Sequence, residues 1–168
     1  DAVELAYSGA QVIHPKTIRP LENKKIPLYV KPFGNPLAEG SIICENAQPV
    51  TMPVYIWREN QILITMRAKD FAFVLEESLS HIFEIIHRHH LTVSLVQSSA
   101  VTISVCVDNN RFVERAIQEL QDAYLVTWND NLRLLTIRGT TPEIVKKEQE
   151  NRAILLSQTT RRTARLVI

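Results

Sequence analysis

The chain has 168 residues, of which 45% are hydrophobic and 22% are charged, and its formal net charge is +1 at pH 7. This composition excludes a disordered or fibrous chain and is typical of a globular protein with a hydrophobic core. The near-zero charge gives no long-range field for nucleic acid or an anionic membrane, and no segment has the roughly 18 consecutive apolar residues of a membrane span. We therefore expect a soluble protein with no nucleic-acid and no membrane partner.

The two cysteines, Cys44 and Cys106, are far apart and lack the spacing of a metal site. Cys106 falls inside an alternating apolar run, where a buried free thiol is common. Free thiols are typical of a reducing compartment, so we expect a cytoplasmic protein.

Residues 1–45 are rich in proline and glycine and consist of short runs between turns. The pattern predicts a helix that ends near Gly9, followed by short strands and tight loops. His14 is expected at a helix exit, hydrogen-bonded to the backbone of a turn. Because a native start rarely falls inside a helix, we expect the C-terminal part of a longer protein, in which residues 1–45 end an α/β domain and residues 46–60 form a connector.

Residues 61–130 predict a complete α+β unit. The expected elements are a strand at 61–67, a helix at 75–88, strands at 91–96 and 101–107, a helix from 112 and a strand at 124–128. Only a short turn separates the second and third strands, so they must form an antiparallel hairpin, while the helix before them permits parallel pairing with the first strand. Strand, helix, strand, strand, helix, strand is the ferredoxin-like order.

An imperfect internal repeat relates this unit to residues 131–168. Ile64 to Arg67 resemble Leu135 to Arg138, and Gln97-Ser98-Ser99 resemble Gln158-Thr159-Thr160. Such self-similarity indicates a second copy of one supersecondary unit. This copy contains strand, helix, strand and strand and then stops, so either it is shortened or another element completes its sheet.

Most candidate chemical groups have an ordinary structural explanation. His87, Arg88, His89 and His90 lie at the end of a predicted helix, where cations interact favourably with the helix dipole, and no carboxylate or cysteine converges on them at metal-site spacing. The predicted central strand lacks the aromatic residues with which RNA-binding units of the same strand order stack bases. No nucleophile triad or phosphate-binding glycine loop is present, so we predict no catalytic residue and no metal site.

One place in the predicted unit suits a small ligand. The turn from Arg67 to Val74 joins a strand to a helix, an edge of the sheet where ligands often bind, and backbone N–H groups at a helix start suit a carboxylate. The side chains assigned to this effector site are Asp70, Phe71, Phe73, Val93, Ser94, Gln97, Ser98 and Ser99. An equally good alternative is that the polar members are hairpin and edge residues that face solvent.

Several ordered motifs resemble one enzyme family. Glu4 to Gly9, Val12 to Ile18, Ile26-Pro27 and Asn35-Pro36 resemble the end of the amino-acid kinase domain of aspartokinases. The stretch FEIIHRHHLTVSLVQSSAVTISV is similar to the regulatory ACT region of the same enzymes. The resemblance implies two ferredoxin-like ACT units in tandem after the tail of a kinase domain.

The resemblance also implies a function. The parent enzyme would transfer the γ-phosphate of ATP, with Mg²⁺, to the side chain of aspartate, while this part alone would be inactive and hold no cofactor. Gln11 and Val12 fall at nucleotide-contacting positions, although family members usually carry lysine at position 11. Ser94 falls where lysine-sensitive members carry an acid.

The resemblance therefore leads to two hypotheses. In the first, paired ACT units hold a homodimer together and bind an amino-acid effector, lysine or threonine, in the pathway to lysine, threonine and methionine. In the second, the ACT units only assemble the enzyme and bind no effector.

Overall fold

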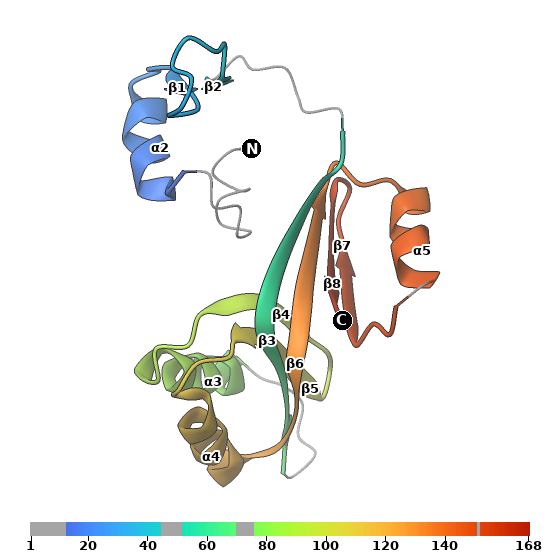
Figure 1. Cartoon of the computed structure of the whole chain (residues 1–168). Helices are drawn as coiled ribbons and strands as arrows, with labels where there is room; N and C mark the ends of the chain where they lie inside the picture. The colour runs from blue at the N-terminus through green and yellow to red at the C-terminus, as the bar shows by residue number, and fades with distance from the viewer. Residues whose placement is uncertain (1–12, 45–51, 70–75, 151) are drawn as a thin grey trace.

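A computed structural model of the chain describes residues 13–44, 52–69, 76–150 and 152–168 (Figure 1). In the first of these ranges, helix α2 (Pro15–Asn23) is followed by the short antiparallel strands β1 (Leu28–Val30) and β2 (Ser41–Ile43). The predicted helix that ends near Gly9 lies outside the described residues. His14 stands at the start of α2, and the predicted hydrogen bond to backbone is present, because its Nδ1 accepts from the Lys16 N–H, as an N-cap residue does.

The remaining strands form one six-stranded antiparallel sheet in the order β4-β5-β3-β6-β8-β7. Its strands are β3 (Val54–Ala68), β4 (Val93–Ser98), β5 (Thr102–Asp108), β6 (Tyr124–Arg138), β7 (Leu156–Thr159) and β8 (Thr163–Val167). Its helices are α3 (Glu76–Arg88), α4 (Val113–Ala123) and α5 (Pro142–Glu150). The predicted hairpin is confirmed, whereas β4 is bonded to β5 and not to β3.

The two long strands β3 and β6 each run through both repeated units. Val54 to Arg58 pair with the second half of β6, and Leu63 to Ala68 pair with its first half. The predicted connector is therefore wrong over residues 54–60, which are strand, and the predicted boundaries at 60/61 and 130/131 both fall inside a strand. Asn60 (φ 53°) and Asn131 (φ 54°) mark the middle of each strand, and the β3–β6 register shifts near Asn60.

The first unit has the ferredoxin-like architecture that the sequence predicts. It consists of the second half of β3, α3, β4, β5, α4 and the first half of β6, in the sheet order β4-β5-β3-β6. Alternate residues of β3 point to α3 and α4, so Ile62, Ile64 and Met66 pack with Ile82 and Leu120 in one buried core.

The second unit gains its fourth strand from the first half of β3. Residues 131–168 supply β6, α5, β7 and β8, the predicted strand, helix, strand, strand series, and β3 lies on the free side of β6. The second unit has its own buried core, which includes Leu135, Val145 and Leu166, and Trp57 of β3 packs against it. The guanidinium carbons of Arg133 and Arg152 lie 5.0 and 4.9 Å from the centroid of the Trp57 ring. Burial and two cation–π contacts hold this strand in place.

The sheet faces that carry no helix share a third buried cluster. Leu63, Leu95 and Cys106 of the first unit lie in it with Leu134 and Leu156 of the second. The edge strands also approach one another, because Gln158 Nε2 of β7 lies 3.5 Å from the Val96 carbonyl of β4. The sheet is therefore curled, with α3 and α4 on one side and α5 on the other (Figure 1).

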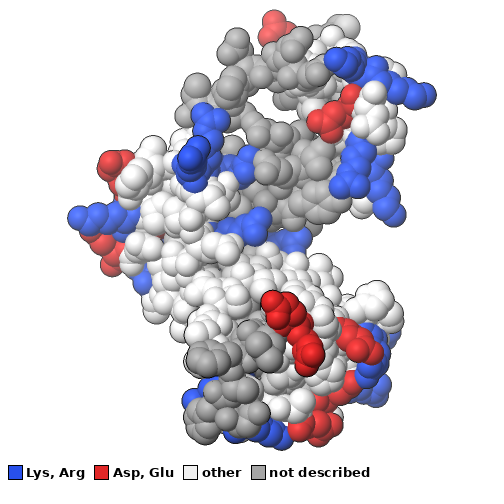
Figure 2. Space-filling model, turned by 180° about the vertical axis from the view of Figure 1, so that it is seen from behind, with Lys and Arg blue, Asp and Glu red and all other residues white. Residues whose placement is uncertain are grey.

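None of the helices among the described residues is long and apolar enough to cross a membrane. The face of the molecule that Figure 2 shows carries both basic and acidic side chains.

Candidate effector site

The structure separates the predicted effector residues of β4 into two groups. Val93 and Ser94 lie at the start of the strand, and Gln97, Ser98 and Ser99 lie at its end. At about 3.3 Å per residue, Ser94 and Ser98 are roughly 13 Å apart. A single amino acid could not contact both groups through its α-amino and α-carboxylate groups alone.

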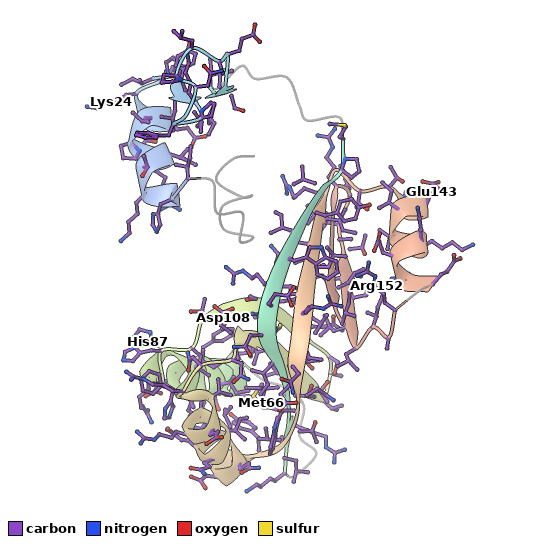
Figure 3. The ribbon with its side chains drawn as sticks, in the orientation of Figure 1. Lys24, Met66, His87, Asp108, Glu143 and Arg152 are labelled. Atoms are coloured by element: carbon purple, nitrogen blue, oxygen red, sulfur yellow. The ribbon has the colours of Figure 1, made fainter. Side chains whose placement is uncertain are left out.

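The first group lies where the two units meet. The β4–β5 register shifts between Val93 and Leu95, so Ser94 occupies an irregular position in the strand. Arg58 Nη1 of β3 donates a hydrogen bond to Ser94 Oγ at 2.9 Å and lies 3.6 Å from Asp108 Oδ1. Asp108, labelled in Figure 3, lies beside the middle of β3. Ser94 therefore contacts a strand that also belongs to the second unit.

A buried glutamine continues this polar network. Gln61 is 1% exposed, and its Nε2 donates to Asp108 Oδ1 at 2.7 Å and to the Glu59 carbonyl at 3.1 Å. Its Oε1 lies 3.6 Å from Cys106 Sγ. Burial, with the Asp108 charge as a second cause, raises the pKa of the Cys106 thiol to about 12, so this thiol stays protonated and unreactive.

In the second group, the Ser99 side chain serves the hairpin turn. Ser99 Oγ accepts from the Thr102 N–H at 3.1 Å and lies 2.7 Å from Thr102 Oγ1. The β7–β8 hairpin has a related turn. The Ser99 N–H donates to the Thr102 carbonyl at 2.8 Å in the first hairpin, and the Thr160 N–H donates to the Thr163 carbonyl at 2.8 Å in the second. The repeat predicted from sequence is thus confirmed at its hairpins, and Ser99 is explained by the turn.

Gln97 and Ser98 remain as exposed polar side chains at the end of β4, which β5 separates from β3. Gln97 is opposite Ser104 of β5, which hydrogen-bonds Thr65 of β3 at 2.9 Å. Arg67 is opposite Thr102 two residues further along, so the ends of β3 and β4 lie at the same end of the sheet. Apart from Ser99, which serves the turn, Gln97 and Ser98 are thus the described polar side chains of the predicted site that are exposed at this end of the sheet.

Five predicted residues lie outside the described residues. Asp70, Phe71 and Phe73 follow β3 in the sequence, and Gln11 and Val12 belong to the first twelve residues. Their assignments to an effector and to a nucleotide stay predictions.

The histidine-rich helix end carries an ion-pair cluster. Arg88 bonds to Glu84 and Glu119, and His89 Nε2 donates to Glu119 Oε2 at 2.6 Å. These bonds lower the pKa of Glu119, the His89 hydrogen bond being the largest cause and the Arg88 charge a further one. The cluster joins α3 to α4, and among the described residues no three His, Cys, Asp or Glu side chains gather as metal ligands.

Arg58 was not among the residues predicted from the sequence, although it contacts Ser94 and Asp108 where the two units meet. It was placed in the connector, and 36 residues separate it from Ser94. The only available signal was the alternation of Val54, Ile56 and Arg58, which is too short to identify a partner strand.

Comparison with known proteins identifies the relatives of the chain, although no protein-family model matches it. Lysine-sensitive aspartokinase 3 of Escherichia coli K12 is 30% identical over 109 residues, which are 64% of this chain and 24% of that protein. Aspartokinase 1, chloroplastic, of Arabidopsis thaliana is 32% identical over 125 residues, 71% of this chain and 22% of that protein. The chain thus spans about a quarter of the length of these curated relatives.

Solved structures agree with this relationship in fold. E. coli aspartokinase III in complex with lysine and aspartate superposes with a TM-score of 0.79 at 23% identity over 99% of this chain and 41% of that chain. A putative C-terminal regulatory domain of aspartate kinase from Porphyromonas gingivalis W83 gives 0.60 at 16% identity over 70% of this chain and 86% of its own. The chain shares the fold of that regulatory domain, and on the sequence matches it belongs to the aspartokinase family.

Proposed function

We propose that this chain regulates an aspartate kinase by binding an amino-acid effector, lysine or threonine, in its first ACT unit. The observation that carries the proposal is the superposition of 99% of the chain on an aspartokinase in complex with lysine and aspartate. The exposed Gln97 and Ser98 at the end of β4 support it, because they offer hydrogen-bonding groups at the end of the sheet where β3 also ends, and Asp70, Phe71 and Phe73 follow β3 in the sequence.

The parent enzyme, on this proposal, transfers the γ-phosphate of ATP to the β-carboxylate of aspartate with Mg²⁺. Gln11 and Val12 are proposed to lie near its nucleotide, and its subunits are proposed to pair through the ACT units. We also propose a cytoplasmic location, which the free thiols of Cys44 and Cys106 support. This chain alone is expected to have no kinase activity.

A second function is favoured by a specific observation. The Ser94 hydroxyl is engaged by Arg58 and the Ser99 hydroxyl by its own turn, so two proposed effector contacts already have partners within the chain. An ACT region that only assembles the enzyme would show these same internal contacts.

Thermal unfolding separates the two functions. An effector at 100 times its dissociation constant stabilises the folded chain by about 2.7 kcal/mol, which raises the midpoint by roughly 5–10 °C for a protein of this size. The midpoint would be measured with lysine, threonine, methionine and other amino acids at millimolar concentration.

The proposed site is tested with Gln97→Ala/Ser98→Ala, which should remove the shift. Thr159→Ala, at the position of the second hairpin equivalent to Ser98, is the matched control and should retain it. If wild-type chain melts cooperatively at one temperature with every amino acid, effector binding is contradicted and the assembly function remains.

A further inference from the structure

The sheet of the second unit contains arginines but no acidic residue. Its strand segments are residues 54–58, 132–138, 156–159 and 163–167. Four arginines and no Asp or Glu lie in these segments. Opposite charges on neighbouring strands stabilise a sheet, and this sheet has no such pair. An arginine that projects from it therefore has no carboxylate within the sheet itself.

Arg165 of β8 points to the face of this sheet that carries no helix. Its neighbours Ala164 and Leu166 pack in the core to which α5 contributes Val145. Successive side chains of a strand alternate between the two faces, so Arg165 lies on the same face as Val167, which belongs to the buried cluster that both units share. Arg165 is half-buried there, and its guanidinium takes part in none of the ion pairs or side-chain hydrogen bonds of the described residues.

Thr136 of β6 lies directly opposite Arg165 on this face. The two residues are register partners, so their Cβ atoms are about 4.5–5.5 Å apart. Thr136 is 2% exposed, and none of the side-chain hydrogen bonds within the described ranges involves its hydroxyl. Every fully buried side-chain nitrogen or oxygen of those ranges has a partner, so the Thr136 hydroxyl must keep a small accessible surface. It is a nearly buried donor that a ligand can still reach.

Gln158 of β7 completes a polar row across three strands. It is opposite Arg165 and half-buried, and its Nε2 lies 3.5 Å from the Val96 carbonyl of β4. On each of the three strands, the row Thr136, Arg165 and Gln158 lies two residues from a member of the shared cluster. Because that cluster also contains residues of the first unit, the row faces the first unit.

The first unit presents polar but uncharged side chains at the corresponding place. Two residues beyond its own members of the shared cluster come Thr65, Ser104 and Gln97, of which Thr65 and Ser104 are half-buried. Gln97 directly follows Val96, so the two polar rows approach one another where β4 meets β7. The space between the units is therefore bordered by hydrogen-bonding groups.

No acid of the first unit is available to Arg165. Within residues 61–68, 93–98, 102–108 and 124–129, the single acid is Asp108. Its carboxylate accepts from Gln61 Nε2 at 2.7 Å and lies 3.6 Å from Arg58 Nη1. A half-buried guanidinium thus remains beside an unused hydroxyl, with no anion to bind.

We propose that Arg165, Thr136 and Gln158 form a second ligand site, which binds a small oxyanion, a carboxylate or a phosphate group, between the two units. A guanidinium offers parallel N–H donors that match two oxygens of either group, and the Thr136 hydroxyl adds a further donor. Partial burial strengthens these bonds, because less water competes for them. A cation would be repelled by Arg165, and an apolar ligand would leave the Thr136 hydroxyl without a partner.

Isothermal titration calorimetry on the 168-residue chain tests the site. The probes are inorganic phosphate and succinate, each added separately at constant ionic strength. Wild type should bind a single anion of at least one kind, and the kind that binds tells a phosphate site from a carboxylate site. Arg165→Gln should weaken this binding by about tenfold or more, because the charge-assisted hydrogen bonds are lost.

Thr136→Val separates anion binding from stability. Valine has nearly the shape of threonine and suits a strand, and it replaces a nearly buried hydroxyl that has no partner among the described residues. The thermal midpoint without anion should therefore stay the same or rise, while the anion affinity should fall by about threefold or more. Arg161→Gln removes one exposed positive charge from the same hairpin and is the matched control, which should bind the anion as wild type does.

Three results overturn the proposal. The first is that wild type binds neither anion, and the second is that Arg165→Gln or Thr136→Val binds with wild-type affinity. The third is a lower midpoint of Thr136→Val without anion, which would mean that the hydroxyl already has a partner in the folded chain. The amino-acid thermal shift is a separate measurement on other residues, so this site and the effector site can each fail without the other.

Discussion

Glu119 shows how a single side chain joins two helices. Its carboxylate accepts hydrogen bonds from Arg88 and His89 at the end of α3, while its own helix is α4. Because these hydrogen bonds stabilise the ionised carboxylate, they hold the pKa of Glu119 below the usual value of 4.5.

The lowered pKa predicts a pH-dependent contribution to stability. A group with a lowered folded pKa stabilises the protein above its unfolded pKa and loses that effect as the pH falls through the folded value. Glu119→Gln should therefore lower the thermal midpoint at pH 7, and its difference from wild type should shrink below about pH 4.5. Glu114→Gln, an exposed acid of α4 with no ion pair among the described residues, is the control and should show no such trend.

At the scale of elements, the long strands β3 and β6 each contain one asparagine with a left-handed backbone conformation near the middle of the strand. Asn60 and Asn131 adopt positive φ, and Asn60 Nδ2 also donates to the Asn109 carbonyl at 2.9 Å. Asparagine tolerates this left-handed conformation better than most residues, whereas a β-branched side chain is strained there. The two residues let each strand bend where it passes from one unit to the other.

This arrangement predicts a clear order among substitutions at the two asparagines. Asn60→Val and Asn131→Val should each lower the free energy of unfolding by about 1–3 kcal/mol, because valine is strained at positive φ. Asn60→Gly and Asn131→Gly should cost at most about 1 kcal/mol, because glycine adopts that conformation freely. Urea denaturation measures each difference, and a valine variant as stable as its glycine partner would contradict this role for the bend.

At the scale of the whole molecule, the two units cannot be separated by cutting the chain between them. The second unit takes its fourth strand, including the Trp57 side chain, from residues that precede the first unit. The first unit in turn takes its last strand from the same β6 that begins the second. Each unit is therefore completed by a strand that continues into the other.

Truncation tests this interdependence. A chain that starts at residue 61 should lose hydrogen-exchange protection in β8, because Leu135 and Ile137 lose the strand that covers their edge, while β5 remains protected. A chain that starts at residue 52 retains β3 and should protect both strands. Equal protection of β8 in the two chains would show that the fourth strand is dispensable.

The sequence by itself determined the local elements and their repetition. Period-two and helical patterns located β4, β5 and α3 to within a few residues, because each element buries one face and that requirement acts locally. The motifs between Glu4 and Pro36 and the stretch at residues 83–105 were also sufficient to indicate the aspartokinase family, which the comparisons confirm. Of the effector site, sequence predicted the hydroxyl-rich end of β4 but not that Ser99 serves the turn.

Only the tertiary structure decided how the two units share strands. Residues 54–60 resemble a connector because Pro53 precedes them and Arg58, Glu59 and Asn60 interrupt their alternation. Their partners, Leu134 to Arg138, lie more than 70 residues later, and pairing over such a separation leaves no local pattern. The contact of Arg58 with Ser94 depends on the same pairing, because it forms only after the fold brings the two residues together.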